Sequence, residues 1–284
     1  MRGAPQKKVF LNTKLSYTEL MNLVSSEFNF LKPVKLYNLI RLGNKYDGGY
    51  ILPEHFVNNS DGLISFGYGY DPSFENEYIK KSNNKVLIYD HTCNYLTLIK
   101  IFLKYLKRFL LFKKQFKDVI YHYNNLKRHH DFVRSKKVNF FKKKIVKKEL
   151  NDNEINIDKI IKLSNFQNII LKCDIEGSEY EIIDDILKYE NLINCIVVEF
   201  HHIDLNLTTF KLMVKKLLDF YQIVHLHGNN HDPIIKDLNI PSTLEITFVK
   251  KIFIKKEEFI KKFPVDGLDQ PNNPFIHDHV IYFE

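Results

Sequence analysis

Acidic and histidine side chains stand at the ends of two apolar segments that we expect to be strands. The segments are residues 169–173 and 193–200, and the side chains that end or follow them are Asp174, Glu176, Glu199, His201 and His202. Parallel strands of an open α/β sheet bring their carboxyl ends to one edge, where ligands bind. A histidine beside a carboxylate is suited to proton removal, because its pKa lies near neutrality and the acidic neighbour fixes its tautomer. We therefore predict acid–base chemistry at this edge, with Asp174, Glu199 and a histidine as catalytic groups.

Structural explanations compete with this interpretation. Glu176 and Glu179 stand at the start of an expected helix, where negative charge complements the helix dipole. A histidine at a strand end is also commonly structural, and adjacent strand residues face opposite ways, so we expect only one of His201 and His202 to reach the site. Asp174 is harder to explain by structure alone, because an unpaired buried carboxylate is costly.

A third polar segment, residues 225–231, contains three histidines and two asparagines. Such side chains donate and accept hydrogen bonds and suit a hydroxyl-rich substrate. We predict that three of them contact the substrate: His227, Asn229 and Asn230. Combined with Asp174 and Glu199 the segment could also hold a metal ion, but the spacing of a dedicated zinc motif is absent, so we expect none.

A glycine turn between two apolar segments indicates a nucleoside-containing cofactor. Residues 63–66 lead into Gly67 and Gly69, which let the backbone approach a ligand without Cβ interference. Residues 86–89 end on Asp90, a side chain able to accept both hydroxyls of a ribose. A dinucleotide fingerprint would place a third glycine three residues after the second, where this chain has proline. The turn therefore favours a nucleoside over a dinucleotide pyrophosphate.

The alternation of elements from residue 61 onward predicts a mostly parallel α/β sheet with helices on both faces. Expected strands are 63–66, 86–89, 138–146, 168–173, 193–200, 223–226 and 244–249. Expected helices are 72–81, 157–163, 178–189 and 208–221. Residues 1–60 are expected to form an N-terminal extension with a helical stretch at 17–29, residues 61–284 one domain, and its last part, 252–284, a loop-rich tail.

The composition is that of an ordinary globular protein, with 44% hydrophobic and 27% charged residues in 284. Cys93, Cys173 and Cys195 have no paired spacing, so we expect buried free thiols and a reducing, cytoplasmic location. The N-terminus lacks the apolar stretch of a secretion signal, and lysines or arginines interrupt every later apolar run.

The strongest deviation in charge is the segment 91–150, with seventeen basic and three acidic residues. We expect a helical insertion at about 93–136, whose first helix, 95–116, is apolar on one side and basic on the other. Three interpretations stay open: lysines that are merely solvated, a site for an anionic substrate, and a helix on a membrane surface. Nucleic-acid binding is disfavoured, because aromatic residues are not regularly interleaved with the charges.

The polar segments, taken in order, resemble the FkbM-type methyltransferases, which use S-adenosylmethionine. The matching segments are 47–50, 65–69, 73–75, 174–179, 198–202, 229–230 and 244–248. Residues 174–179 are the most specific of them, and the resemblance covers most of residues 41–250. It implies a seven-stranded Rossmann-like sheet with an antiparallel last strand, and methyl transfer to an oxygen, often of a sugar or natural product.

The resemblance also implies roles for individual residues. Gly67 and Gly69 would pass the methionine part of the cofactor, Asp90 would bind its ribose, and Asp174 and Glu176 would line the floor near the methyl group. Further expected cofactor contacts are Gly49, Tyr68 and Glu75, and Tyr50 is an expected substrate contact. The chain departs from the commoner family pattern at residues 90–92 and in the basic insertion, and these departures bear on the substrate more than on the cofactor.

We therefore predict an O-methyltransferase that acts on a hydroxyl of a sugar, such as a nucleotide sugar or a surface-polysaccharide precursor. The partner is expected to be a small-molecule or glycan acceptor, anionic in character because of the basic insertion; a homo-oligomer and a peripheral membrane contact stay open. Two alternatives are a nicotinamide-dependent oxidoreductase and a basic nucleic-acid-binding protein on a Rossmann-like scaffold.

Overall fold

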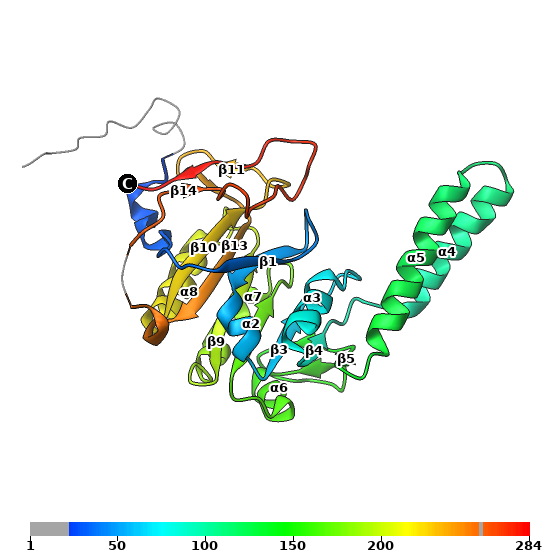
Figure 1. The fold of residues 1–284 in the computed structure, drawn as a ribbon, viewed down its shortest axis with the longest axis horizontal. Helices are drawn as coiled ribbons and strands as arrows, with labels where there is room; N and C mark the ends of the chain where they lie inside the picture. Colours follow the sequence, from blue (N-terminus) through cyan, green and yellow to red (C-terminus); the bar gives the residue numbers. More distant parts are fainter. Residues whose placement is uncertain (1–22, 256–257) are drawn as a thin grey trace, which may run out of the picture.

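A seven-stranded sheet forms the centre of the computed structural model, which describes residues 23–255 and 258–284 (Figure 1). From one edge to the other its strands are β10 (Tyr221–Gly228), β13 (Leu244–Lys250), β9 (Ile193–Phe200), β8 (Ile169–Cys173), β3 (Gly62–Phe66), β4 (Lys85–Tyr89) and β5 (Val138–Phe141). The last strand in sequence, β13, is antiparallel to both neighbours, and the other pairings are parallel. The predicted fold class, with its antiparallel last strand, is confirmed.

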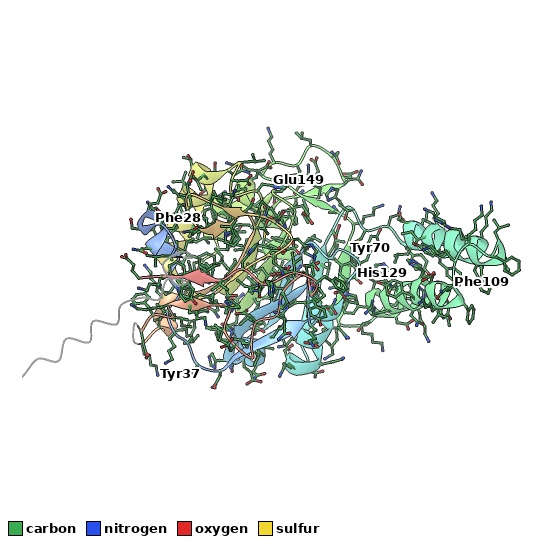
Figure 2. The ribbon with its side chains drawn as sticks, turned by 90° about the horizontal axis from the view of Figure 1, so that it is seen from above. Phe28, Tyr37, Tyr70, Phe109, His129 and Glu149 are labelled. Atoms are coloured by element: carbon green, nitrogen blue, oxygen red, sulfur yellow. The ribbon has the colours of Figure 1, made fainter. Side chains whose placement is uncertain are left out.

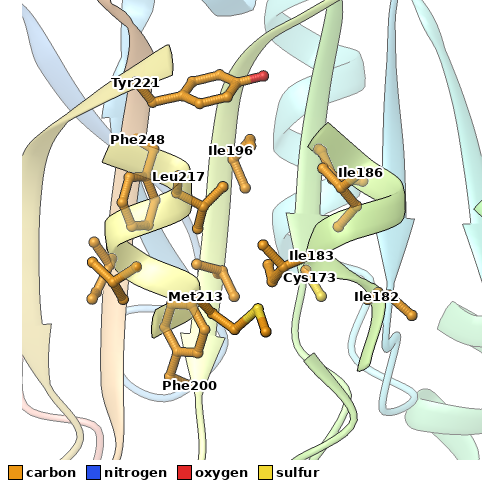
Figure 3. Packing of buried hydrophobic residues seen from close by; sticks show 14 of the residues in the cluster. Cys173, Ile182, Ile183, Ile186, Ile196, Phe200, Met213, Leu217, Tyr221 and Phe248 are labelled. Atoms are coloured by element: carbon orange, nitrogen blue, oxygen red, sulfur yellow. The ribbon is translucent and has the colours of Figure 1, made fainter. Parts of the chain in front are cut away.

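Alternate residues of the central strands enter two separate hydrophobic clusters, one on each face of the sheet. Ile64 and Phe66 belong to the first cluster, whereas Leu63 belongs to the second. Such strands are buried on both sides, which explains why they read as nearly continuous apolar runs. The first face is covered by α6 (Ile157–Ser164), α7 (Glu179–Leu187) and α8 (Leu207–Phe220). Figure 3 shows side chains of α7 and α8 packed against β8, β9 and β13.

The second face is covered by a β-hairpin and short helices. The hairpin pairs β1 (Leu39–Gly43) with β2 (Gly49–Pro53), and the helices are α2 (Glu54–Asn59) and α3 (Ser73–Ser82). The hairpin lies in residues 1–60, predicted as an N-terminal extension, and its Leu42, Tyr50 and Leu52 belong to the second cluster. This extension is therefore packed on the sheet in the part that is described.

Several predicted boundaries need correction. The predicted strand 138–146 breaks into β5 and the short β6 (Lys144–Ile145), because β6 pairs with β7 (Glu154–Ile155) outside the main sheet. The predicted helix at 17–29 falls partly outside the described residues, and the described part contains the 3-10 helix η1 (Ser26–Leu31). The remaining short elements are β11 (Ile234–Ile235), β12 (Ile240–Pro241), η2 (Lys251–Phe253), β14 (Lys262–Phe263) and β15 (Ile281–Tyr282).

The basic insertion is a helical hairpin that projects from the sheet domain (Figures 1 and 2). It consists of α4 (Tyr95–Leu110) and α5 (Phe116–Val133). Tyr70, from the turn after β3, and His129, from α5, lie at its base, and Phe109 lies near its far end (Figure 2). The expected helical insertion is therefore present, with its first helix ending earlier than predicted.

The prediction of buried free thiols is confirmed for all three cysteines, Cys93, Cys173 and Cys195. Among the described residues, no helix has both the length and the apolar character needed to cross a bilayer.

Candidate active site

The turn after β3 is shaped by two glycines with positive φ. Gly67 has φ +77°, and a Cβ there would lie 1.5 Å from the carbonyl oxygen of Asp174, so no other residue fits. Gly69 has φ +59°, but a Cβ there would have no atom within 4 Å. Gly67 is thus needed for close packing of two strand ends, whereas Gly69 faces open space. Asp71 then accepts hydrogen bonds from the backbone N–H (3.2 Å) and hydroxyl (2.9 Å) of Ser73 at the start of α3.

Asp90 organises this turn and also lines a cavity at the end of β4. One oxygen accepts the N–H groups of Tyr68 (2.9 Å) and Gly69 (3.1 Å), and the other accepts the N–H (2.7 Å) and hydroxyl (2.6 Å) of Thr92. The N–H of Cys93 also donates to this second oxygen, and its thiol donates to the first. Burial alone would raise the pKa of Asp90, but the hydrogen bonds outweigh it and lower the pKa to about 2. Six donors thus share the roughly four acceptor positions of an ionised carboxylate, so a ribose hydroxyl would have to replace one of them, and the predicted ribose contact stays a prediction.

Asp174, which follows β8, is bound on one oxygen and open on the other. Its Oδ2 accepts the Tyr50 hydroxyl (2.8 Å) and lies 3.3 Å from Nζ of Lys172. No hydrogen bond from the described residues reaches Oδ1, which lies 3.8 Å from Nε2 of His201. The side chain keeps 24% of its exposure. Asp174 therefore presents an accessible acceptor oxygen while its other oxygen is fixed.

Glu199 is buried behind Asp174. Its Oε1 accepts a hydrogen bond from Asn229 (2.8 Å), and its Oε2 lies 3.0 Å from the Tyr50 hydroxyl. Burial, followed by the nearby carboxylates of Asp174 and Glu245, raises the pKa of Glu199 to about 8. The Tyr50 hydroxyl lies between two carboxyl groups but can donate its single proton to only one of them. When Glu199 is protonated, it can donate to the Tyr50 oxygen, and Tyr50 then donates to Asp174.

His201 lies in a ring of carboxylates. Its Nδ1 is 2.9 Å from Oε1 of Glu179, and its Nε2 is 3.7–3.9 Å from oxygens of Asp174, Glu176 and Glu199. Burial alone would lower the pKa of His201, but the hydrogen bond to Glu179 and the surrounding negative charges raise it to about 9. His201 is therefore an imidazolium at neutral pH, which weakens the prediction that it is the base.

His202 points elsewhere, and the prediction that it is a catalytic candidate is corrected. It has φ +52° and is exposed, and its ring lies against the turn at Gly177. The chain turns sharply after β9, so the two adjacent histidines face different surroundings. Only His201 joins the acidic cluster.

Asp174, Glu176 and His201 are also the candidate metal ligands of this site. Each offers one ligand atom, and these atoms lie within 4.8 Å of one another. Two carboxylate oxygens and an imidazole nitrogen are a ligand set that divalent cations accept. Lys172 already supplies positive charge to Asp174. The expectation of a metal-free site stays a prediction.

Two cavities meet at the cluster. The first, of about 190 Å³, is lined by the turn after β3, the end of β4, β6 and the segment after β8. The second, of about 470 Å³, is lined mainly by the turn between β1 and β2, by Tyr68 to Glu75, and by Lys172. Three residues line both: Gly69, Asp174 and Glu176. A ligand in the first cavity and a ligand in the second would therefore both border on these three residues.

The other predicted cofactor residues are distributed unevenly around the cavities. Tyr68 and Glu75 line the second cavity. Glu75 is buried with Oε1 bound to Ser65 (2.6 Å), while Oε2 has no partner in the described chain. Gly49 reaches neither cavity; a Cβ there would lie 2.1 Å from the carbonyl oxygen of Asn44, so the glycine serves the hairpin turn. Its assignment to the cofactor is corrected.

The three predicted substrate residues of the 225–231 segment are buried in structural contacts. His227 is 3.0 Å from Asp278, and Asn230 donates to carbonyl groups of the tail at residues 273, 276 and 277. The side-chain amide of Asn229 donates a hydrogen bond to the buried carboxyl group of Glu199. These residues fix the tail and the cluster and line neither cavity, so their substrate role is corrected. Tyr50, by contrast, lines the second cavity as expected of a substrate contact.

Two residues of the cluster escaped the sequence prediction as functional groups. Lys172 is buried in β8, donates to the carbonyl oxygen of Gly67 (2.7 Å) and stands beside Asp174. A lysine inside an apolar strand, two residues before Asp174 and so on the same face, was the available signal. Glu179 was interpreted as helix charge, but it is fully buried and fixes His201.

No protein-family model matches the sequence, and no curated protein sequence does. Similar solved structures include a fibrillarin/Nop5p complex (7% identity, 67% of this chain and 72% of that chain, TM-score 0.37). Another is an rRNA methylase from Streptococcus thermophilus (7% identity, 69% and 93%, TM-score 0.37). A putative caffeoyl-CoA O-methyltransferase from Staphylococcus aureus also matches (12% identity, 69% and 80%, TM-score 0.30). These scores are too low to bear on function, and the fold assignment rests on the sheet order itself.

Proposed function

We propose that the protein is an S-adenosylmethionine-dependent methyltransferase in which the first cavity receives the methyl donor and the second the acceptor. The observation that carries the proposal is the junction of the two cavities at Gly69, Asp174 and Glu176. A transfer reaction needs two ligands held in contact and in register, and positioning alone supplies a large part of the rate.

The residues of the first cavity suit the methionine end of such a donor. Gly69 leaves open the space that a Cβ would fill. The donor supplies a methyl group bound to a positively charged sulfur, and the carboxylates of Asp174 and Glu176 at the junction would attract that charge. Asp90 holds the turn beside this cavity, and it would bind the ribose where a hydroxyl replaces one of its donors.

In this proposal the acceptor hydroxyl hydrogen-bonds to the open Oδ1 of Asp174, which takes its proton. Lys172 and Tyr50 fix the other oxygen and so orient the carboxylate. His201 acts as a positioning residue, because its charged ring stabilises the carboxylates at the junction and does not line either cavity. This revises the predicted division of roles: the carboxylate replaces the histidine as proton acceptor.

The acceptor we propose is a sugar hydroxyl, as predicted from the resemblance. The second cavity is rich in groups that donate to or accept from hydroxyls: Asn44, Asp47, Tyr50, Asp71 and Lys172. The lysines of residues 95–117 line neither of these cavities, so the case for an anionic acceptor depends on Lys45 and Lys172.

A nicotinamide-dependent oxidoreductase fits less well. The common dinucleotide-binding sheet is formed by six parallel strands. Here an antiparallel strand, β13, lies between β9 and β10, and proline occupies the position of the third glycine.

Titration calorimetry with S-adenosylmethionine and, separately, with NAD tests the proposal. We expect binding of S-adenosylmethionine and none of NAD. Asp174→Asn should weaken binding of the cationic donor by about tenfold, through loss of one favourable charge. Binding of NAD in preference to S-adenosylmethionine would refute the proposal.

A further inference from the structure

The far end of the α4–α5 hairpin carries exposed apolar side chains. Within the hairpin tip, residues 110–116, the exposed fractions are 66% for Leu110, 53% for Leu111, 98% for Phe112 and 59% for Phe116. The tip projects away from the sheet domain (Figures 1 and 2). Apolar side chains gathered at the end of a projection, with no described residue to cover them, mark an interaction site.

The backbone presents Phe112 at an energetic cost. The N–H of Lys113 binds the carbonyl oxygen of Arg108, and the N–H of Phe112 binds that of Phe109, which closes the end of α4. Phe112 occupies the left-handed position of this turn, with φ +56°. That position normally belongs to glycine or asparagine, because a side chain is strained there. A strained and almost fully exposed phenylalanine gives nothing to the fold, which favours a role in binding.

Positive charge surrounds the tip. Residues 95–117 contain seven basic side chains and no acidic one. Five of them line a shallow groove along α4 and the turn after it, together with Leu103 and Leu111: Lys100, Lys104, Lys107, Arg108 and Lys113. Apolar groups ringed by lysines match a bilayer with anionic headgroups, since the apolar side chains enter the interface while the cations meet the phosphates.

We propose that the hairpin tip docks this protein onto the surface of membranes that contain anionic lipids. The contact is peripheral, as none of the described helices could span a bilayer. RNA fits less well, because two of the four exposed tip side chains are leucines, which do not stack on bases as phenylalanines can. A symmetric dimer through the tip also fits less well, because a twofold contact pairs a surface with itself. It would bring the seven basic side chains of one copy close to the same seven of the other, and these would repel one another.

The base of the hairpin links this surface to the glycine turn. The N–H of Asn94 donates to the Tyr70 hydroxyl (2.7 Å), and Nδ1 of His129 lies 3.0 Å from the Tyr68 hydroxyl. Tyr68 and Tyr70 both belong to the turn that lines the cavities. Docking of the tip would thus fix the orientation of the cavities relative to the membrane. The proposal does not depend on the chemistry of those cavities.

Co-sedimentation of the full chain with vesicles tests the proposal without any cofactor. We expect binding to phosphatidylcholine vesicles that contain phosphatidylserine to exceed binding to phosphatidylcholine alone by at least about tenfold, and to weaken with salt. Phe112→Asn should lower binding by about tenfold or more. Because asparagine tolerates the left-handed backbone, this variant should melt at the same temperature or higher.

Leu163→Asn, a substitution at an exposed leucine of α6, is the matched control and should bind like the wild type. Lys107→Glu combined with Arg108→Glu should abolish the preference for anionic vesicles. The proposal is overturned if the wild type shows no such preference or if Phe112→Asn binds unchanged. It is also overturned if Phe112→Asn instead abolishes a dimer or binding to single-stranded RNA while vesicle binding is absent.

Discussion

At the scale of single residues, the junction of the cavities depends on how protons are shared among Asp174, Glu199 and His201. Tyr50 connects Asp174 and Glu199, and Glu179 fixes His201. The raised pKa values of Glu199 and His201 mean that both hold a proton at neutral pH, while Asp174 keeps an open oxygen. The proton acceptor for a substrate is therefore expected to be Asp174.

Substitution of Asp174 should lower turnover much more than substitution of His201. Asp174→Asn is expected to lower kcat by about 10²–10⁴, the usual worth of an acid–base group. His201→Asn should lower it by about ten- to hundredfold through misplacement of the carboxylates, and His202→Asn should leave it unchanged. The measurement is a pH profile of each variant. A tenfold rise in wild-type kcat per pH unit between pH 7 and 9 would instead identify neutral His201 as the base.

The protonation of Glu199 has a consequence for stability. Its pKa is raised on folding, so the folded protein binds a proton that the unfolded chain releases, and stability falls as pH rises from about 4.5 to about 8. The expected slope is on the order of 1 kcal/mol per pH unit. Glu199→Gln, which copies the protonated form, should flatten this loss.

Chemical denaturation between pH 5 and 6.5 is the suitable measurement, because His201 begins to lose its own contribution only above about pH 6.5. Glu54→Gln, at an exposed ion pair with Lys81, is the control and should retain the wild-type slope. Equal slopes for wild type and Glu199→Gln would show that Glu199 is ionised in the folded protein.

At the scale of elements, the strand ends supply the site because each central strand is apolar along its length and polar at its end. The last residues that β3, β8 and β9 direct to the second face of the sheet are polar: Ser65, Lys172 and Glu199. The antiparallel β13 brings Glu245 opposite Glu199 at the same edge. Burial of the apolar part stabilises the sheet, and the polar ends meet where the two cavities open.

Alanine variants of three glycines with positive φ distinguish the effect of backbone strain on stability from an effect on ligand binding. Gly67→Ala adds a clash with the backbone of Asp174 and should destabilise the fold by about 3 kcal/mol or more. Gly267→Ala has the same φ sign and open space, so it should cost only about 1–2 kcal/mol. Gly69→Ala should match Gly267→Ala in stability but weaken donor binding, because Gly69 lines both cavities and Gly267 lines neither. Thermal melts and calorimetry measure the two effects; equal donor binding by both variants would contradict the assigned cavity.

The sequence predicted this arrangement where the signal was local. Apolar runs with polar ends predicted β3, β4, β8 and β9, and the antiparallel β13 followed from the resemblance. The structure differed from the prediction where contacts between distant parts of the chain determine the surroundings of a side chain. Asp90 looked like a free carboxylate, but donors from residues 68–69 and 92–93 converge on it only in the folded turn. His227 and Asn230 looked like substrate groups, but the tail covers them through contacts more than forty residues away.

At the scale of the whole molecule, the site is assembled from parts far apart in the chain. The β1–β2 hairpin contributes Tyr50, the central strands contribute the carboxylates, and the base of the α4–α5 hairpin holds the glycine turn. The tail fastens β10 and β13, with Asn272 donating to Glu245 (2.7 Å) and Asp269 within 3.0 Å of His225. The cavities therefore depend on the complete fold.

The charge balance of the assembled cluster predicts independence from metal ions. Lys172 and the charged His201 already place positive charge beside Asp174, and Glu199 is protonated. Addition of EDTA should leave donor binding unchanged within about twofold, whereas a metal chelated by Asp174, Glu176 and His201 would make it fall with chelator and return with Mg²⁺ or Mn²⁺. Calorimetry before and after chelation distinguishes the two results.

The division of the site into a donor cavity and an acceptor cavity is tested most directly by a co-crystal structure with S-adenosylhomocysteine. We predict that the ligand occupies the first cavity, with its methionine end beside Gly69 and its sulfur directed toward the junction at Asp174 and Glu176, and leaves the second cavity free. A ligand bound in the second cavity, or outside both, would contradict the account.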